Sequence, residues 1–146
     1  MRHSTIATNA LPSSTLVLSS CLSLFTGHTS LVGHLQLRDD VLVSGGSDGR
    51  VIVFSLKTNE CIHRLCAHDN SVTSLQFDSN FIVTGANDGR VKVWDFRTGK
   101  LLRELVEVTA GAVVWKVCFK DDNVVALYTS DDKTIMDVIS FRPVAQ

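Results

Sequence analysis

The chain repeats itself without a gap: residues 28–65, HTSLVGHLQLRDDVLVSGGSDGRVIVFSLKTNECIHRL, return at residues 68–105 as HDNSVTSLQFDSNFIVTGANDGRVKVWDFRTGKLLREL. Thirteen of the 38 paired positions are identical, whereas unrelated sequences of ordinary composition share about two or three over this length. The same offset of 40 places residues 21–25 over residues 61–65. The folding unit is therefore about 40 residues long.

Each copy has the pattern of four short strands. Asp-Gly pairs at 48–49 and 88–89 mark hairpin turns, because glycine adopts the positive φ that such turns need. A third, weaker copy at 113–141 has three strands and lacks both the turn glycine and the tryptophan of the second copy. Four strands in about 40 residues predict one blade of a β-propeller. The strands expected in the second copy are 72–77, 81–85, 90–95 and 101–105.

The second copy resembles the WD-repeat family. The motifs that carry the resemblance are Ala67-His68, in place of Gly-His, and the Trp94-Asp95 dipeptide. In that family a loop His, a strand Ser or Thr, a turn Asp and a strand Trp form a buried hydrogen-bonded tetrad inside each blade. The resemblance implies that this tetrad is made here by His68, Thr84, Asp88 and Trp94.

The first copy matches the same tetrad at His28, Ser44 and Asp48, with Phe54 in the place of the tryptophan. Phenylalanine has no hydrogen-bond donor, so this blade is expected to lose one bond. The Ser, His and Asp types also suit a hydrolase triad. However, the set recurs every 40 residues and no G-x-S-x-G motif is present, so a structural network is the favoured interpretation.

The strand count predicts an open ring. About three blades fall short of the roughly four to eight of closed propellers. We therefore predict an all-β fold, a partial WD-repeat β-propeller, and expect the chain to be a fragment completed by missing blades of a longer parent or by self-association. The Ser/Thr-rich residues 1–20 lie outside the repeat and are expected to be disordered. The predicted WD-repeat region, 21–146, holds an outer strand at 21–25, complete blades at 28–65 and 68–105, and an incomplete blade at 113–141.

The closer resemblance is to the C-terminal blades of fungal F-box/WD-repeat proteins, the substrate receptors of SCF ubiquitin ligases. The phrases GHTSLVG, ECIHRLCAHDNSVTSLQF, DGRVKVWD and AVVWKVCF carry it, together with KTIMDVISF near the end. The resemblance implies a platform that captures protein substrates, sometimes with arginines that hold phosphate. The alternative is a WD-repeat scaffold in another assembly, such as a corepressor or an organelle-division adaptor.

The chain departs from such receptors in two respects. No leucine-rich helical segment of the F-box kind precedes the repeats. The places where phosphate-holding arginines would stand carry no basic residue, and Lys116 is the nearest cation. If the segment contributes to a partner site, the expected residues at the mouth of the ring are Ser47, Thr73, Asn87, Trp115 and Lys116. Trp115 could instead pack inside its blade.

Charge and cysteine spacing exclude several other functions. Fourteen Lys and Arg against fifteen Asp and Glu leave a net charge of −1, which disfavours binding to nucleic acid or to an anionic membrane surface. The run from Cys61 through His63 and Cys66 to His68 suggests a zinc site, but a role for His68 in the tetrad argues against it. We therefore expect no cofactor and no catalytic residue, protein partners, reduced cysteines, and a location in the cytoplasm or nucleus.

Overall fold

The computed structural model describes residues 6–7, 16–105 and 111–141 of the 146-residue chain. Every regular element in this described part is a β-strand, and no helix in it is able to cross a membrane. Two strands precede the repeat: β1 (Ile6–Ala7) and β2 (Leu18–Ser19).

The repeat folds into three antiparallel sheets, which we call blades one, two and three. Successive strands pair with each other in every sheet, and only blade three has three strands rather than four within the described residues. The predicted all-β partial propeller is confirmed. Blade one comprises β3 (Val32–Arg38), β4 (Val41–Gly46), β5 (Val51–Ser55) and β6 (Glu60–Leu65); blade two comprises β7 (Val72–Phe77), β8 (Phe81–Ala86), β9 (Val91–Asp95) and β10 (Leu101–Glu104); blade three comprises β11 (Val113–Lys120), β12 (Asn123–Ser130) and β13 (Lys133–Ser140).

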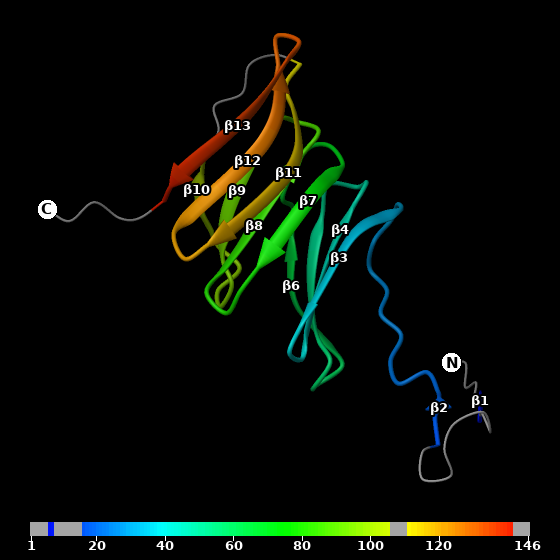
Figure 1. The fold of residues 1–146 in the computed structure, drawn as a ribbon. Helices are drawn as coiled ribbons and strands as arrows, with labels where there is room; N and C mark the ends of the chain where they lie inside the picture. Colours follow the sequence, from blue (N-terminus) through cyan, green and yellow to red (C-terminus); the bar gives the residue numbers. More distant parts are fainter. Residues whose placement is uncertain (1–5, 8–15, 106–110, 142–146) are drawn as a thin grey trace, which may run out of the picture.

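The blades stack face to face along the chain, with blade two between the other two (Figure 1). The innermost strand of blade two, β7, contacts both β3 and β11. Each junction between blades encloses its own apolar cluster. Blade two therefore buries both of its faces against its neighbours, as expected of a repeat that cannot bury them alone.

A glycine on the second strand of blades one and two lets the next blade approach closely. A Cβ on Gly45 would lie 2.8 Å from a methyl of Val72 and 2.9 Å from a methyl of Leu75. A Cβ on Gly85 would lie 2.6 Å from a methyl of Val114 in blade three. Real Cβ atoms do not approach so closely, so each glycine provides a notch that receives apolar side chains of the following blade.

The predicted hairpin turns are present. Gly49 and Gly89 have φ values of 78° and 79°, in the region that favours glycine. The last hairpin of blade three instead uses Asp131 and Asp132, both at positive φ. Aspartate tolerates that conformation better than most residues, which explains how blade three turns without a glycine.

The prediction of an outer strand at 21–25 is wrong, because the structure has no strand there. The segment lies beside blade one, but no described strand pairs with it, and a strand needs such a partner to form its ladder. Within the segment 1–20, for which disorder is expected, β1 and β2 form a two-residue ladder. Most of that segment lies outside the described residues.

Candidate functional site

The tetrad residues of blade two form one connected hydrogen-bond network. The Nε2 atom of His68 lies 2.8 Å from Oγ1 of Thr84, and its Nδ1 lies 2.9 Å from Oδ2 of Asp88. The indole N–H of Trp94 donates to the same threonine oxygen at 3.1 Å. Thr84 is fully buried and His68 is 8% exposed. The network joins the loop before β7 to β8, β9 and the turn between them.

Burial lowers the pKa of His68, although the neighbouring Asp88 carboxylate opposes the shift. A neutral ring suits the observed geometry, because Nδ1–H donates to Asp88 while Nε2 accepts the Thr84 hydroxyl proton. Asp88 also accepts the backbone N–H of Arg90 at 2.9 Å and that of Asp69 at 3.3 Å. The network thus satisfies polar groups inside the blade and fixes its turn.

Blade one has the same network with one bond fewer. His28 Nε2 lies 2.7 Å from Ser44 Oγ, and its Nδ1 lies 3.2 Å from Asp48 Oδ1. Phe54 occupies the tryptophan position and packs against Phe25, with 4.7 Å between ring centroids. Burial acts to raise the pKa of Asp48, but hydrogen bonds from the Thr29 and Arg50 N–H groups and from His28 outweigh it and lower the pKa to about 2.

Blade three has neither part of the network. The strand register that pairs Leu75 with Thr84 in blade two pairs Val117 with Ala126 in blade three. In the same way, the position of Trp94 corresponds to Ile139. Ala126 is fully buried and carries no polar side-chain group. The tetrad is therefore complete in blade two, one bond short in blade one and absent from blade three.

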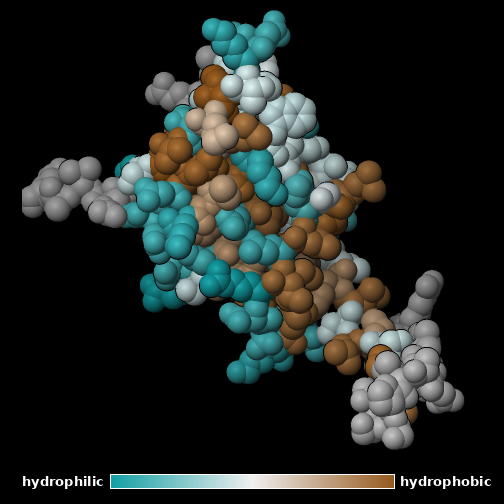
Figure 2. Space-filling view, in the orientation of Figure 1, coloured by the Kyte–Doolittle hydropathy of each residue, from teal (hydrophilic) through white to brown (hydrophobic). Residues whose placement is uncertain are grey.

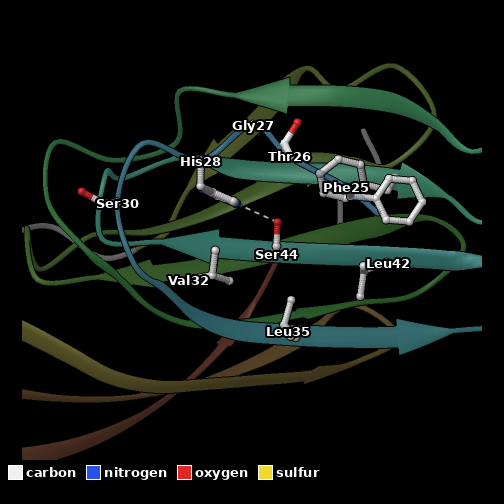
Figure 3. Close-up of a pocket in the computed structure, with 10 residues that line it drawn as sticks. Phe25, Thr26, Gly27, His28, Ser30, Val32, Leu35, Leu42 and Ser44 are labelled. Carbon is white, nitrogen blue, oxygen red and sulfur yellow. Dashed lines mark hydrogen bonds between the residues drawn. The ribbon is translucent and has the colours of Figure 1, made fainter. Parts of the chain in front are cut away.

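The Ser44–His28–Asp48 arrangement has the connectivity of a hydrolase triad. Ser44 and His28 line an open apolar groove with Phe25, Leu35 and Leu42 (Figure 3). Blade two repeats the arrangement with a threonine that is completely buried beneath blade one. A network that recurs where no substrate can enter serves the blade itself. The groove marks the face where a preceding blade would pack.

Three of the four possible zinc ligands are held by other contacts. His63 Nε2 lies 2.7 Å from the Phe96 carbonyl oxygen, and Cys61 Sγ donates to the carbonyl of His63. His68 belongs to the tetrad. Among the described residues, no cluster of three or more His, Cys, Asp or Glu side chains could hold a metal ion.

The structure brings Thr73 and Trp115, two of the predicted mouth residues, into equivalent places on their inner strands. Each inner strand contains a β-bulge one or two residues after its start, and the bulged residues are Gly33, Thr73 and Trp115. Thr73 is half-buried and donates its hydroxyl to the Val114 carbonyl, so it serves the junction between blades. Trp115 is 55% exposed, which contradicts the alternative that it packs inside its blade. Its indole N–H donates to Thr129 at 3.3 Å.

The remaining predicted mouth residues are exposed, and none of them has a large apolar side chain. Ser47 and Asn87 precede the turn aspartates, and both side chains face solvent. Lys116 is exposed beside Trp115. Burial lowers the pKa of His34 on the inner strand of blade one, and the Lys116 charge lowers it further. Trp115 is therefore the one large apolar side chain among the predicted mouth residues.

The sequence family described as the Vps8 β-propeller matches residues 16–144. The chain belongs to the Vps8 β-propeller family. Among curated proteins, no sequence matches it. The family match over residues 16–144 and the three stacked blades support the WD-repeat type of propeller that the tetrad residues suggested.

Solved structures similar to this Vps8-family chain support the same fold. The computationally designed protein Ika4 is 36% identical, with a TM-score of 0.71 over 86% of this chain and 72% of Ika4. The designed protein Ika8 is also 36% identical with a TM-score of 0.71, over 87% of this chain and 37% of Ika8. The WD40 propeller domain of Doa1 is 21% identical, with a TM-score of 0.66 over 79% of this chain and 38% of that chain. This Vps8-family chain thus spans well under half of the last two.

Sequence reasoning missed the side chains that join one blade of this Vps8-family chain to the next. Gln36 accepts the backbone N–H of Phe77 at 2.9 Å, and Gln76 accepts that of Phe119. Ser74 accepts the N–H of Val117 at 3.0 Å. The identity of Gln36 and Gln76 in the repeat was the available signal. Because these bonds cross between sheets, their meaning depends on blade stacking.

Proposed function

We propose that this chain supplies part of a protein-binding surface at the mouth of a propeller, centred on Trp115. Propellers of the WD-repeat type generally serve as platforms for protein–protein interaction and are typically not catalytic. The exposed indole ring of Trp115 is the observation that supports this site. Tryptophan is enriched among the residues that dominate binding energy at interfaces.

The position of Trp115 strengthens the proposal. In blades one and two the corresponding bulge residues are Gly33, which has no side chain, and Thr73, whose hydroxyl is bonded to blade three. Trp115 alone of the three projects a large apolar group from the start of its inner strand. Lys116 adds a positive charge beside it, which suits a partner with an acidic or carbonyl-rich edge.

A pull-down with a tagged version of the chain, in which the captured partners are quantified, tests this proposal. We expect Trp115→Ala to reduce the captured amount of the principal partner at least tenfold, while its unfolding midpoint stays that of the parent protein. Leu102→Ala is the matched control, since Leu102 is 51% exposed on the outer strand of blade two. Equal capture by Trp115→Ala and wild type would contradict the proposal.

The finer proposal is that the chain belongs to a substrate receptor of an SCF-type ubiquitin ligase in the cytoplasm or nucleus. Its support is the resemblance of phrases such as GHTSLVG and KTIMDVISF. The descriptions of the matched family and structures mention no F-box or ubiquitin ligase. They fit equally a scaffold in another assembly. Co-purification of ligase core subunits with the natural gene product supports the receptor; their absence from an otherwise intact assembly favours the scaffold.

A further inference from the structure

Residues 21–25 occupy the place of an outer strand although they form none. Ser23 Oγ lies 2.6 Å from Oδ1 of Asn59 in the turn after β5, and the Phe25 ring packs on Phe54. These contacts hold the segment against the outer part of blade one. Its backbone has no partner strand among the described residues.

The next junction has the same contacts one repeat later. Adding 40 to Ser23 and Asn59 gives His63 and Gly99, and the His63 ring lies 2.7 Å from where a Cβ of Gly99 would stand. The partners of the second contact become Leu65 and Trp94, which share one core cluster. There the docked segment is β6, the outer strand of blade one. The segment 21–25 therefore docks on blade one as an outer strand of a preceding blade whose three inner strands are not in place.

The face of blade one beside this segment is uncovered. Leu35 is 65% exposed and Leu37 is 61% exposed, whereas Phe77, which corresponds to Leu37 in blade two, is 3% exposed. Apolar side chains gather over this end of the stack and continue into the segment before it (Figure 2). The face thus has the side chains of a junction between blades and lacks the neighbouring blade.

The other end of the stack has the complementary deficiency. Blade three consists of β11, β12 and β13, and within the described residues β13 pairs only with β12. Blades one and two each have a fourth strand at that edge. Met136 and Val138 of β13 are 71% and 68% exposed on the face that points away from blade two. Among the described residues, β11 to β13 have no outer strand, and residues 21–25 have no inner strands of their own beside blade one.

We propose that a second copy of this chain completes both ends. Blade three of one copy docks on blade one of the other, and residues 21–25 of that other copy pair with β13 to make a four-stranded blade. Two identical junctions then close a ring of six blades, within the range of about four to eight known for propellers. Closure also removes the free strand edge, which otherwise invites aggregation.

The strand register of this junction follows from the intact blade one. There Cys61 lies opposite Phe54, and His63 lies opposite Val53. Through the repeat and the pairing of β12 with β13, these correspond to Cys21 opposite Ile139 and Ser23 opposite Val138 of the second copy.

The inner part of the junction differs from the other two. The register places Leu127 where Gly45 and Gly85 form notches, and Cys118 where Gln36 and Gln76 join the blades. The side chain of Leu127 fills the notch, so the inner strands cannot approach as closely there. The pairing of residues 21–25 with β13 therefore contributes most of the stability of this junction.

The mass of the wild-type chain in solution is the first test. Size-exclusion chromatography with light scattering is expected to give about 32 kDa, twice the 16.0 kDa of one chain. A 16 kDa species at micromolar concentration overturns the proposal, because each copy then tolerates both open ends. A ladder of larger assemblies or an aggregate overturns the closed ring. The result is independent of the partner site at Trp115.

A disulfide bond across the junction tests the register. In a chain with Cys61→Ser, Cys66→Ser and Cys118→Ser, the variant Ile139→Cys is expected to form a covalent dimer with the native Cys21 on oxidation. Opposed strand residues have the Cα separation that a disulfide needs. Non-reducing electrophoresis should stop at the dimer.

Two controls use the same three-serine background. The variant Met136→Cys lies opposite Phe25 rather than Cys21 in the proposed register, so it should give no dimer. The chain with Cys21 as its only cysteine should also remain uncrosslinked. A dimer with Met136→Cys but none with Ile139→Cys overturns the register. Failure of both to crosslink a folded protein of 32 kDa overturns the strand pairing.

Discussion

Blades one and two share a sequence pattern and a strand register. They differ in how deeply each buries the face that points toward the N-terminal end of the stack. Val72 is 4% exposed and the corresponding Val32 is 43% exposed; Phe77 is 3% exposed and the corresponding Leu37 is 61% exposed. The difference lies in what precedes each blade, since blade one covers blade two and no described blade covers blade one. The blade is therefore the unit of secondary structure, while the junction between blades is the unit of stability.

The largest effect should come from truncating the covered face. Phe77→Ala is expected to lower the free energy of unfolding by about 3–5 kcal/mol, because it opens a cavity between blades one and two. Leu37→Ala, at the corresponding uncovered position, should change the stability of a single dilute copy by no more than about 0.5 kcal/mol. Urea unfolding of both variants measures the contrast. Equal losses would show that blade one is already covered.

A glycine at the same junction gives a second, slightly smaller effect. Gly49 has φ of 78°, and a Cβ there would lie 2.1 Å from the carbonyl oxygen of His68 in the loop before blade two. Gly49→Ala is expected to cost about 2–4 kcal/mol through backbone strain and this clash. Gly33→Ala is the control, because no atom lies within 4 Å of its added Cβ. Thermal unfolding in which the two variants melt together would exclude a tight contact at this turn.

The strands and turns followed from the sequence because each depends on local chemistry. Apolar alternation and the Asp-Gly turns determine where β7 to β9 begin and end. What sequence reasoning missed depends on the neighbours. Residues 21–25 carry the pattern of an outer strand but lack a partner for it. Likewise, Gln76 has a role only because Phe119 of the next blade stands opposite it.

The tetrad carries the next effect in size. Asp88→Ala should lower the free energy of unfolding by about 1.5–3 kcal/mol, because it leaves His68 and the backbone N–H groups of Asp69 and Arg90 without their acceptor. Asp40→Ala, at an exposed turn of blade one, should stay within about 0.5 kcal/mol. Denaturant midpoints at fixed pH compare them. Coincident midpoints would remove the tetrad from the stability of blade two.

Converting the tetrad of blade two into that of blade one should have a smaller effect. Trp94→Phe removes the indole N–H that donates to Thr84 and reproduces the situation at Phe54. We expect a loss of about 0.5–1.5 kcal/mol, the net value of one hydrogen bond. Hydrogen exchange of the β8 and β9 amides should accelerate while that of blade one stays unchanged. Faster exchange in all three blades would show instead that Trp94 stabilises the whole stack.

The smallest expected effect is a pH dependence that differs between the two blades. In the fold the pKa of Asp48 is about 2, against 3.8 for an unperturbed aspartate. Between these values the unfolded chain binds more protons, so the free energy of unfolding falls as the pH drops. The pKa of His68 is lowered from 6.5 by burial, so its contribution is complete above pH 6.5 and declines below it. The variant Asp48→Asn retains the His68 contribution and lacks the carboxylate. Its stability deficit relative to wild type should therefore stay constant from pH 7 to about 5 and shrink between about pH 4 and 2, as measured by urea midpoints. A deficit that instead grows between pH 7 and 5 would mean that the carboxylate of blade one acts through a histidine charge rather than through its own hydrogen bonds, because wild type would then gain stability as the ring becomes protonated.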